Sequence, residues 1–147
     1  FTDAVITAAT SPNVHAAAYM NSFASPSFTA LLVIDAATGS LAVQGSNPAV
    51  AGDGTCPAST GNPNCGILTV IGALSASETY SMTSGFDIAG GANGLAIAAL
   101  QRTAPSADVT SRLYRINLST GAASPVLSTA MGGDTGVLLR GLAIRVQ

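Results

Sequence analysis

Short apolar runs bounded by turn-forming residues recur along this chain of 147 residues. Gly, Asn, Ser or Pro separates each run from the next, and several runs are rich in β-branched residues. Such spacing is typical of an all-β sandwich, barrel or propeller. No capped amphipathic stretch indicates a helix. We expect strands at residues 14–22, 29–35, 40–44, 66–74, 81–88, 95–101, 111–117, 124–129 and 136–146.

Some of these runs are continuously apolar instead of alternating. Leu31, Leu32, Val33 and Ile34 follow one another without a polar residue. Because successive side chains of a strand point to opposite faces, a continuous run indicates a strand that is covered on both faces. The sequence therefore predicts sheets that stack on one another.

One strand-and-turn motif occurs twice. Residues 31–39 and 113–121 both read as an apolar strand, then Asp35 or Asn117, then two spacers and Thr-Gly. An Asp or Asn side chain can accept a hydrogen bond from the backbone two residues on, and Gly adopts positive φ at little cost. We expect Gly39 and Gly121 to have positive φ in equivalent hairpins.

Two further matches suggest the length of a repeat. Residues 85–88 match residues 141–144 at 56 positions' distance, and residues 66–68 match residues 121–123 at 55. The two copies of the turn motif are 82 residues apart. An insertion between Leu41 and Cys65 would explain why this spacing is wider than the other two. We predict propeller-like repeats of about 55 residues, as two to three blades or stacked sheets, with a closed β-sandwich as the alternative.

The repeats divide one all-β domain, residues 1–147, into units at about 1–75 and 76–130 and a partial unit at 131–147. Propellers typically have at least four blades, so two to three would leave sheet faces and strand edges uncovered. We therefore expect either that the missing blades belong to a longer parent chain, or that a protein partner or a homo-oligomer covers them through apolar sheet faces and edge strands. The run at residues 136–146 is the candidate strand for such pairing.

Two cysteines, Cys56 and Cys65, enclose a segment rich in turn formers. Their spacing does not match the paired short spacings of a zinc site, and His15 is the single histidine. We favour a disulfide over two free thiols. A disulfide would indicate an oxidising compartment.

Charge is scarce, with five arginines, no lysine and a formal net charge of −2. A nucleic-acid-binding surface needs many cations, so we expect no nucleic acid partner. No apolar run reaches the roughly 18 residues of a transmembrane span. A small net charge gives little self-repulsion, which favours association.

Few residues could carry catalysis. His15 is the single conventional general base, and a triad with Asp35 or Asp87 would need the fold to assemble it. Asp53 and Asp134 lie in short glycine-containing segments, but one carboxylate is thin support for a calcium ion. We expect a non-enzymatic protein with no catalytic, cofactor-binding or metal-ligating residue and no cofactor.

An ordered set of motifs covers most of the chain, at residues 14–23, 31–35, 64–74, 85–88, 113–121 and 140–144. This set resembles the bacterial DUF4394 family. The resemblance implies a propeller-like, exported protein without established activity, so it carries over no site residue. It also implies that this chain corresponds to the C-terminal part of a typical member, from which the cysteine-bracketed segment departs.

Together these features predict a secreted, extracellular or cell-surface bacterial protein. We expect it to be a structural or interaction module that assembles with itself or with a larger surface complex. The alternative is an extracellular module that binds a ligand or glycan. Scarce aromatic residues, with no Trp, count against sugar binding, which commonly uses aromatic stacking.

Overall fold

The computed structural model describes residues 12–26, 29–45, 66–90, 95–108, 110–127, 131 and 137–145. These residues form eight β-strands and no helix, so the predicted all-β class is confirmed. No helix in these ranges has the length and apolar character needed to cross a membrane.

The strands form two four-stranded antiparallel sheets, each with its strands side by side in chain order. β4 ends at Ala73 and β5 begins at Thr79, so a short connection joins the sheets. The first sheet contains β1 (Val14–Tyr19), β2 (Leu31–Asp35), β3 (Ser40–Gln44) and β4 (Leu68–Ala73), and the second contains β5 (Thr79–Ile88), β6 (Ala96–Ala104), β7 (Arg112–Ile116) and β8 (Ala123–Pro125).

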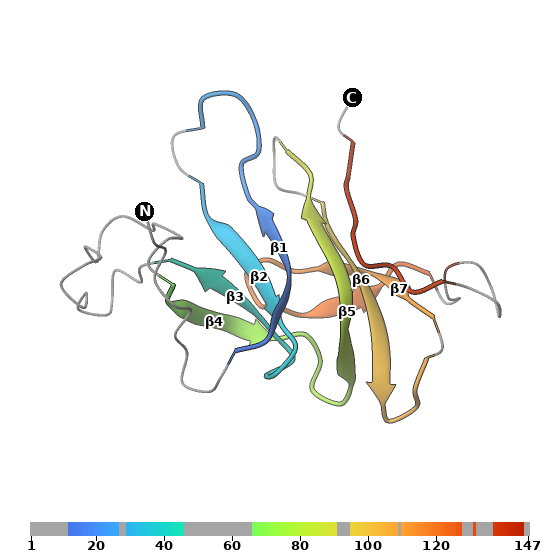
Figure 1. Cartoon of the computed structure of the whole chain (residues 1–147). Helices are drawn as coiled ribbons and strands as arrows, with labels where there is room; N and C mark the ends of the chain where they lie inside the picture. Colours follow the sequence, from blue (N-terminus) through green and yellow to red (C-terminus); the bar gives the residue numbers. More distant parts are fainter. Residues whose placement is uncertain are drawn as a thin grey trace.

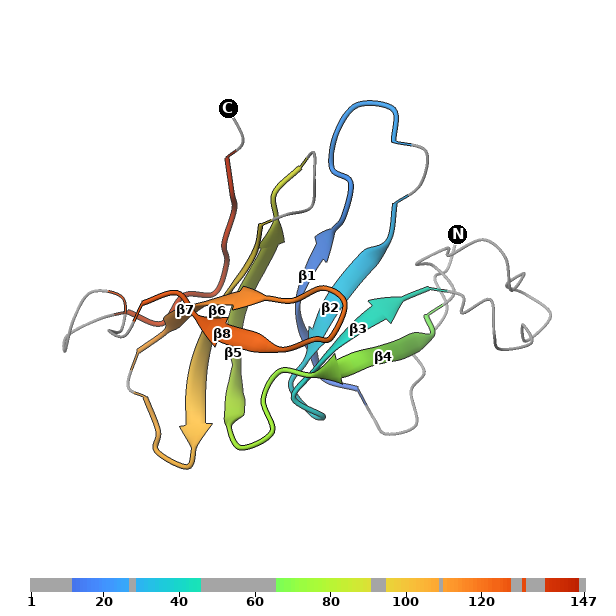
Figure 2. The same cartoon turned by 180° about the vertical axis from the view of Figure 1, so that it is seen from behind.

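The first strands of the two sheets, β1 and β5, lie next to each other and run in the same direction (Figure 1). From these strands each sheet twists outward, so that β4 and β8 cross the molecule at a large angle to β1 and β5 (Figure 2). Such a twist follows from the right-handed preference of individual strands. The sheets therefore diverge from a shared inner pair of strands.

The hydrophobic core lies between the two sheets. Leu32, Ile34 and Leu41 of the first sheet join Phe86 and Ile88 of the second in one buried cluster. The other buried members are Ala18, Leu74, Tyr80, Ala96, Ala98, Leu100, Tyr114 and Ile116. Because both sheets contribute to it, this core holds them together.

The continuous apolar run of β2 is covered on both faces, as predicted. Leu32, Val33 and Ile34 are each at most 2% exposed although Val33 points away from its two neighbours. The same pattern does not extend to β4, where Val70 is 57% exposed. Burial on both faces thus belongs to the inner part of the first sheet.

The prediction of a strand at residues 136–146 is wrong for the part that the structure describes. Residues 137–145 have no regular secondary structure, with a bend at Arg140, and belong to neither sheet. They cross the second sheet at β5, where a Cβ added to Gly85 would lie 2.7 Å from the carbonyl carbon of Gly141. A strand requires a laterally paired neighbour, and apolar sequence alone does not supply one.

The two copies of the turn motif are not at equivalent positions, which corrects the predicted equivalence. Asp35 ends β2 and Gly39 directly precedes β3, whereas Asn117 and Gly121 lie in the connection between β7 and β8. The motif is a local device that closes a hairpin wherever it occurs. Its wider spacing therefore reflects two different hairpins. The predicted insertion between Leu41 and Cys65 falls in the β3–β4 connection, residues 45–67, which is longer than the equivalent β7–β8 connection, residues 117–122.

The match at 55 positions does join equivalent places. Gly66 precedes β4, Gly121 precedes β8, and both glycines have positive φ, at 67° and 79°. Each glycine thus leads into the last strand of its sheet.

Candidate functional site

The side chains of Asp35 and Asn117 hold their turns in the same way. Asp35 Oδ1 accepts from the backbone N–H of Ala37 at 3.0 Å, and Asn117 Oδ1 accepts from that of Ser119 at 2.9 Å. Gly39 and Gly121 have φ of 61° and 79°, the positive values expected of them. These residues have a local structural role in the two hairpins.

The two turn glycines differ in what surrounds them. An added Cβ on Gly39 would meet nothing within 4 Å. One on Gly121 would collide with the backbone of Gly72 in β4. Gly121 thus serves both its own turn and the close approach of the two sheets.

The structure does not assemble a triad from His15 with Asp35 or Asp87. His15 is exposed on β1, and its Nε2 lies 2.6 Å from Oδ1 of Asn13. Asp35 accepts from the backbone N–H of Asn13 at 2.8 Å, so Asn13 stands between the two side chains. Asp87 accepts from the backbone N–H groups of Ile88 and Ile144.

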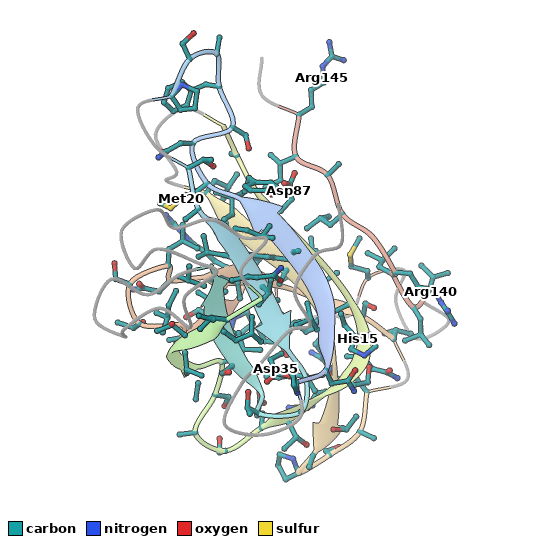
Figure 3. The ribbon with its side chains drawn as sticks, turned by 60° about the vertical axis from the view of Figure 1, so that its left-hand side comes forward. His15, Met20, Asp35, Asp87, Arg140 and Arg145 are labelled. Atoms are coloured by element: carbon teal, nitrogen blue, oxygen red, sulfur yellow. The ribbon has the colours of Figure 1, made fainter. Side chains whose placement is uncertain are left out.

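An open cavity of about 240 Å³ lies where three segments meet. Figure 3 shows His15 on β1, Asp87 on β5 and Arg140 on the 137–145 segment. The walls combine two basic side chains with small residues, which leave backbone within reach. The lining residues are His15, Ala16, Ala17, Gly85, Phe86, Arg140, Gly141 and Leu142.

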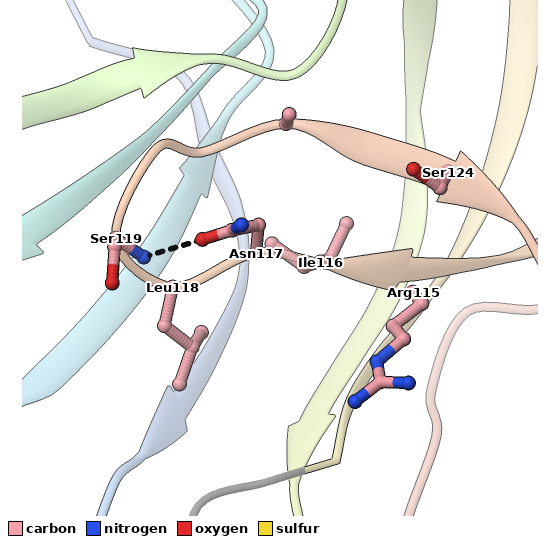
Figure 4. A pocket seen from close by; sticks show the side chains of 7 residues that line it. Arg115, Ile116, Asn117, Leu118, Ser119 and Ser124 are labelled. Atoms are coloured by element: carbon pink, nitrogen blue, oxygen red, sulfur yellow. Dashed lines mark hydrogen bonds between the residues drawn. The ribbon is translucent and has the colours of Figure 1, made fainter.

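A larger open cavity of about 450 Å³ lies along the β7–β8 hairpin (Figure 4). Arg115, Asn117, Ser119 and Ser124 bring polar groups to it, and the remaining lining residues are Ile116, Leu118 and Ala122. Because Asn117 also holds the turn, the shape of this cavity depends on the hairpin.

Sequence reasoning missed a network of charged residues in the second sheet, which we call the loop network: Glu78, Arg102, Asp108 and Arg112. Arg102 bridges Glu78 at 3.0 Å and Asp108 at 3.1 Å, and Arg112 binds Asp108 at 3.1 Å. Gln101 adds a hydrogen bond from its side chain to the carbonyl of Asp108, at 2.8 Å. The network ties the β6–β7 connection to the strands.

Two buried tyrosines lie beside the loop network. Tyr80 donates to Oε2 of Glu78 at 2.9 Å, and its ring packs edge-on against that of Tyr114, with centroids 5.6 Å apart. Burial raises the pKa of Tyr80 well above its usual value, and the hydrogen bond and charge of Glu78 add to this effect. Burial also raises the pKa of Tyr114. Both phenols therefore stay protonated across the physiological range.

Four residues considered from the sequence lie outside the described residues: Cys56, Cys65, Asp53 and Asp134. The disulfide and the two weak calcium loops are therefore not tested by the structure.

The model of a protein family described as "Domain of unknown function (DUF4394)" matches residues 1–143. No curated protein matches the chain. No solved structure matches it either.

Proposed function

Because this chain belongs to the DUF4394 family, whose description assigns no activity, we propose from its geometry that it is a non-catalytic interaction module. In this proposal its two sheets are consecutive blades of a propeller-like assembly with further β-sheet units. The observation that carries the proposal is the side-by-side, same-direction arrangement of β1 and β5, with residues 137–145 next to β5 (Figure 1). A row of first strands can be continued by another sheet.

Exposed apolar side chains near the start of β7 support an interaction there. Val126, Leu127, Val137 and Leu138 are 44–59% exposed. Their segments come together because Val126 donates a backbone hydrogen bond to Leu113, at 2.8 Å, and Ser111 donates one to Val137, at 3.2 Å. Grouped exposed apolar residues often mark a protein interface. We call these four residues the apolar patch.

The size of the particle in solution tests this proposal. We expect light scattering after gel filtration to give a mass above that of one chain, or an increase in mass with concentration. Val137→Asp with Leu138→Asp should reduce the association, because two carboxylates would have to be desolvated in the interface.

Val70→Asp is the matched control. Val70 is equally exposed but lies on β4, away from the patch, so this variant should associate like the parent protein. A parent protein that stays monomeric at every concentration, with no β-sheet partner in native material, would overturn the proposal.

A ligand-binding module is the second candidate, favoured by the cavity on the β7–β8 hairpin (Figure 4). Its arginine, serine and asparagine groups could bind sugar hydroxyls or a sugar carboxylate. Retention on a polysaccharide column that is lost in Arg115→Ala would favour this function over the first.

We further propose that the protein is exported and that Cys56 and Cys65 form a disulfide. The support is their sequence spacing alone. The intact mass of unreduced protein should be lower than that of reduced protein by two hydrogens. Two free thiols in freshly isolated protein would remove this argument for export.

A further inference from the structure

The 137–145 segment presents backbone groups that lack partners among the described residues. Ser111 Oγ binds the N–H of Leu139 at 2.9 Å, and Asp87 Oδ2 binds that of Ile144. Between them, the backbone of Gly141, Leu142 and Ala143 makes no hydrogen bond with any residue that the structure describes. An exposed extended segment with unpaired backbone groups is a template for strand addition.

Beyond the bend at Arg140, one edge of this segment is held and the other is open. In an extended chain, successive N–H groups point to opposite edges. The N–H of Ile144 points toward Asp87, so those of Gly141, Ala143 and Arg145 point to the opposite edge. Gly141, Ala143 and Arg145 are also exposed.

The segment also occupies the place of a first strand. Residues 141–144 match residues 85–88 of β5 in sequence. β1, β5 and this segment follow one another across the molecule in the same direction (Figures 1 and 2). Gly85 permits the close approach, because its missing side chain leaves room for the backbone of Gly141 and Leu142.

In both sheets, the first strand pairs with an antiparallel second strand. β1 pairs with β2, and β5 pairs with β6. In the β5–β6 pair, Gly85 lies opposite Ala99 and Ile88 lies opposite Ala96. Residues 141–144 match residues 85–88 of β5, so the same register can be applied to them. A strand with the sequence of β6 would then place its Ala99 opposite Gly141 and its Ala96 opposite Ile144.

We propose that residues 141–145 are a docking edge for an antiparallel strand like the uncharged part of β6, residues 96–101, supplied by the sheet of a protein partner. This inference rests on the proposed interaction function and specifies its partner. Strand addition would join the main chains by hydrogen bonds. The partner's next strands would then extend a third sheet over the exposed side of the second.

Arg140 directly precedes the docking edge and Arg145 is its last residue, and neither has an ion pair with a described residue. A partner strand with an acidic residue beyond each end of its apolar part would therefore fit best. This guides the design of a probe: the sequence of residues 95–101 with one added glutamate at each end.

Amide hydrogen exchange of the whole protein, with millimolar probe peptide, tests the proposal. We expect protection at Gly141, Ala143 and Arg145, and none with a scrambled peptide. A nitroxide on the peptide's N-terminus should broaden the NMR signals of residues 144–145 most, and one on its C-terminus those of residues 140–141. Broadening in the reverse order, or protection by the scrambled peptide as well, would overturn the proposed antiparallel register.

Two variants distinguish backbone pairing of the peptide with residues 141–145 from nonspecific binding. Ala143→Pro removes an N–H from the open edge and should weaken peptide binding by about tenfold, whereas Ala143→Ser keeps it and should bind as the parent does. To guard against weak affinity, the same strand can be fused after Gln147 through a Gly/Ser linker, which raises its effective concentration. No protection in the fused protein overturns the inference.

The outcome can be distinguished from failure of the proposed function. If the protein associates through the apolar patch but the peptide and the fusion protect nothing, this inference alone fails. If Gly141, Ala143 and Arg145 are protected without peptide, and increasingly with protein concentration, two copies pair through this edge and the proposed partner is wrong.

Discussion

The two sheets use a buried carboxylate at the same place in different ways. In each sheet an aspartate lies at the turn from the second to the third strand: Asp35 is the last residue of β2, whereas Asp108 lies in the β6–β7 connection, and they are 3% and 8% exposed. Asp35 accepts from two backbone N–H groups and the Thr38 hydroxyl, which are neutral donors. Asp108 instead binds the guanidinium groups of Arg102 and Arg112.

Loop length accounts for the difference. The β2–β3 connection, residues 36–39, is so short that the Asp35 carboxylate reaches the backbone of its own turn. The β6–β7 connection, residues 105–111, is longer, and its carboxylate reaches arginines on the two strands instead. A tight turn thus needs one well-placed acceptor, whereas a longer loop needs cations that fix it from outside.

Removing either carboxylate should cause the largest loss of stability among the changes proposed for this comparison. Asp108→Ala would remove the carboxylate that Arg102 and Arg112 share, although Arg102 would keep its ion pair with Glu78, and we expect the change to lower the free energy of unfolding by about 3 kcal/mol. Asp35→Ala should lower it by about 2 kcal/mol, because the donors it leaves are uncharged. Urea denaturation measures both. Equal losses would mean that charge makes no difference between the two loops.

Asparagine substitutions sharpen the same comparison. Asp35→Asn retains an acceptor of the type that Asn117 already provides in its turn, so the loss should be less than about 1 kcal/mol. Asp108→Asn removes the charge that both arginines bind, so we expect the free energy of unfolding to fall by about 2 kcal/mol. High salt should reduce the loss of unfolding free energy caused by Asp108→Asn and leave the loss caused by Asp35→Asn unchanged. A salt effect at Asp35 alone would contradict this account.

The turn glycines should differ by a smaller amount. Gly39→Ala should cost about 1 kcal/mol, from positive φ alone. Gly121→Ala adds a collision with the backbone of Gly72, so the loss should be about 2 kcal/mol. Thermal unfolding of the two variants side by side gives the difference. A larger loss at Gly39 would show that the contact between β4 and the β7–β8 turn relaxes freely.

The smallest expected effect is an alkaline loss of stability that originates in the second sheet. Below about pH 10, Tyr80 is protonated in both the folded and the unfolded chain, so its raised pKa makes no difference. Above that pH, the unfolded chain releases the proton while the folded chain keeps it, so stability falls with pH.

Urea denaturation from pH 8 to pH 11 measures this loss. Tyr80→Phe should remove about 1 kcal/mol of the decline by pH 11. A smaller decline from Tyr114, whose pKa burial also raises, should remain. A decline of the same size in Tyr80→Phe would place its origin elsewhere.

Local patterns predicted the strands well because each strand is bounded by its own turn residues. The prediction for Ser40–Gln44 matches its observed bounds, and the Asp35 and Asn117 turns use the expected side-chain oxygens. Residues 137–145 were mispredicted because a strand also needs a lateral partner, which no local pattern supplies. The loop network was missed for a similar reason, since Glu78 and Arg102 meet only when β5 and β6 pair.

Leu74 lies in the short connection between the sheets and is 1% exposed. Its N–H donates to the carbonyl of Gly39, at 2.9 Å, and its carbonyl accepts from the N–H of Ala123, at 2.8 Å. One residue therefore completes the hydrogen bonding of a turn in the first sheet and of the last strand in the second. Loss of order at Leu74 would therefore remove a hydrogen bond from each sheet, so we expect the described part of the chain to unfold as a single cooperative unit.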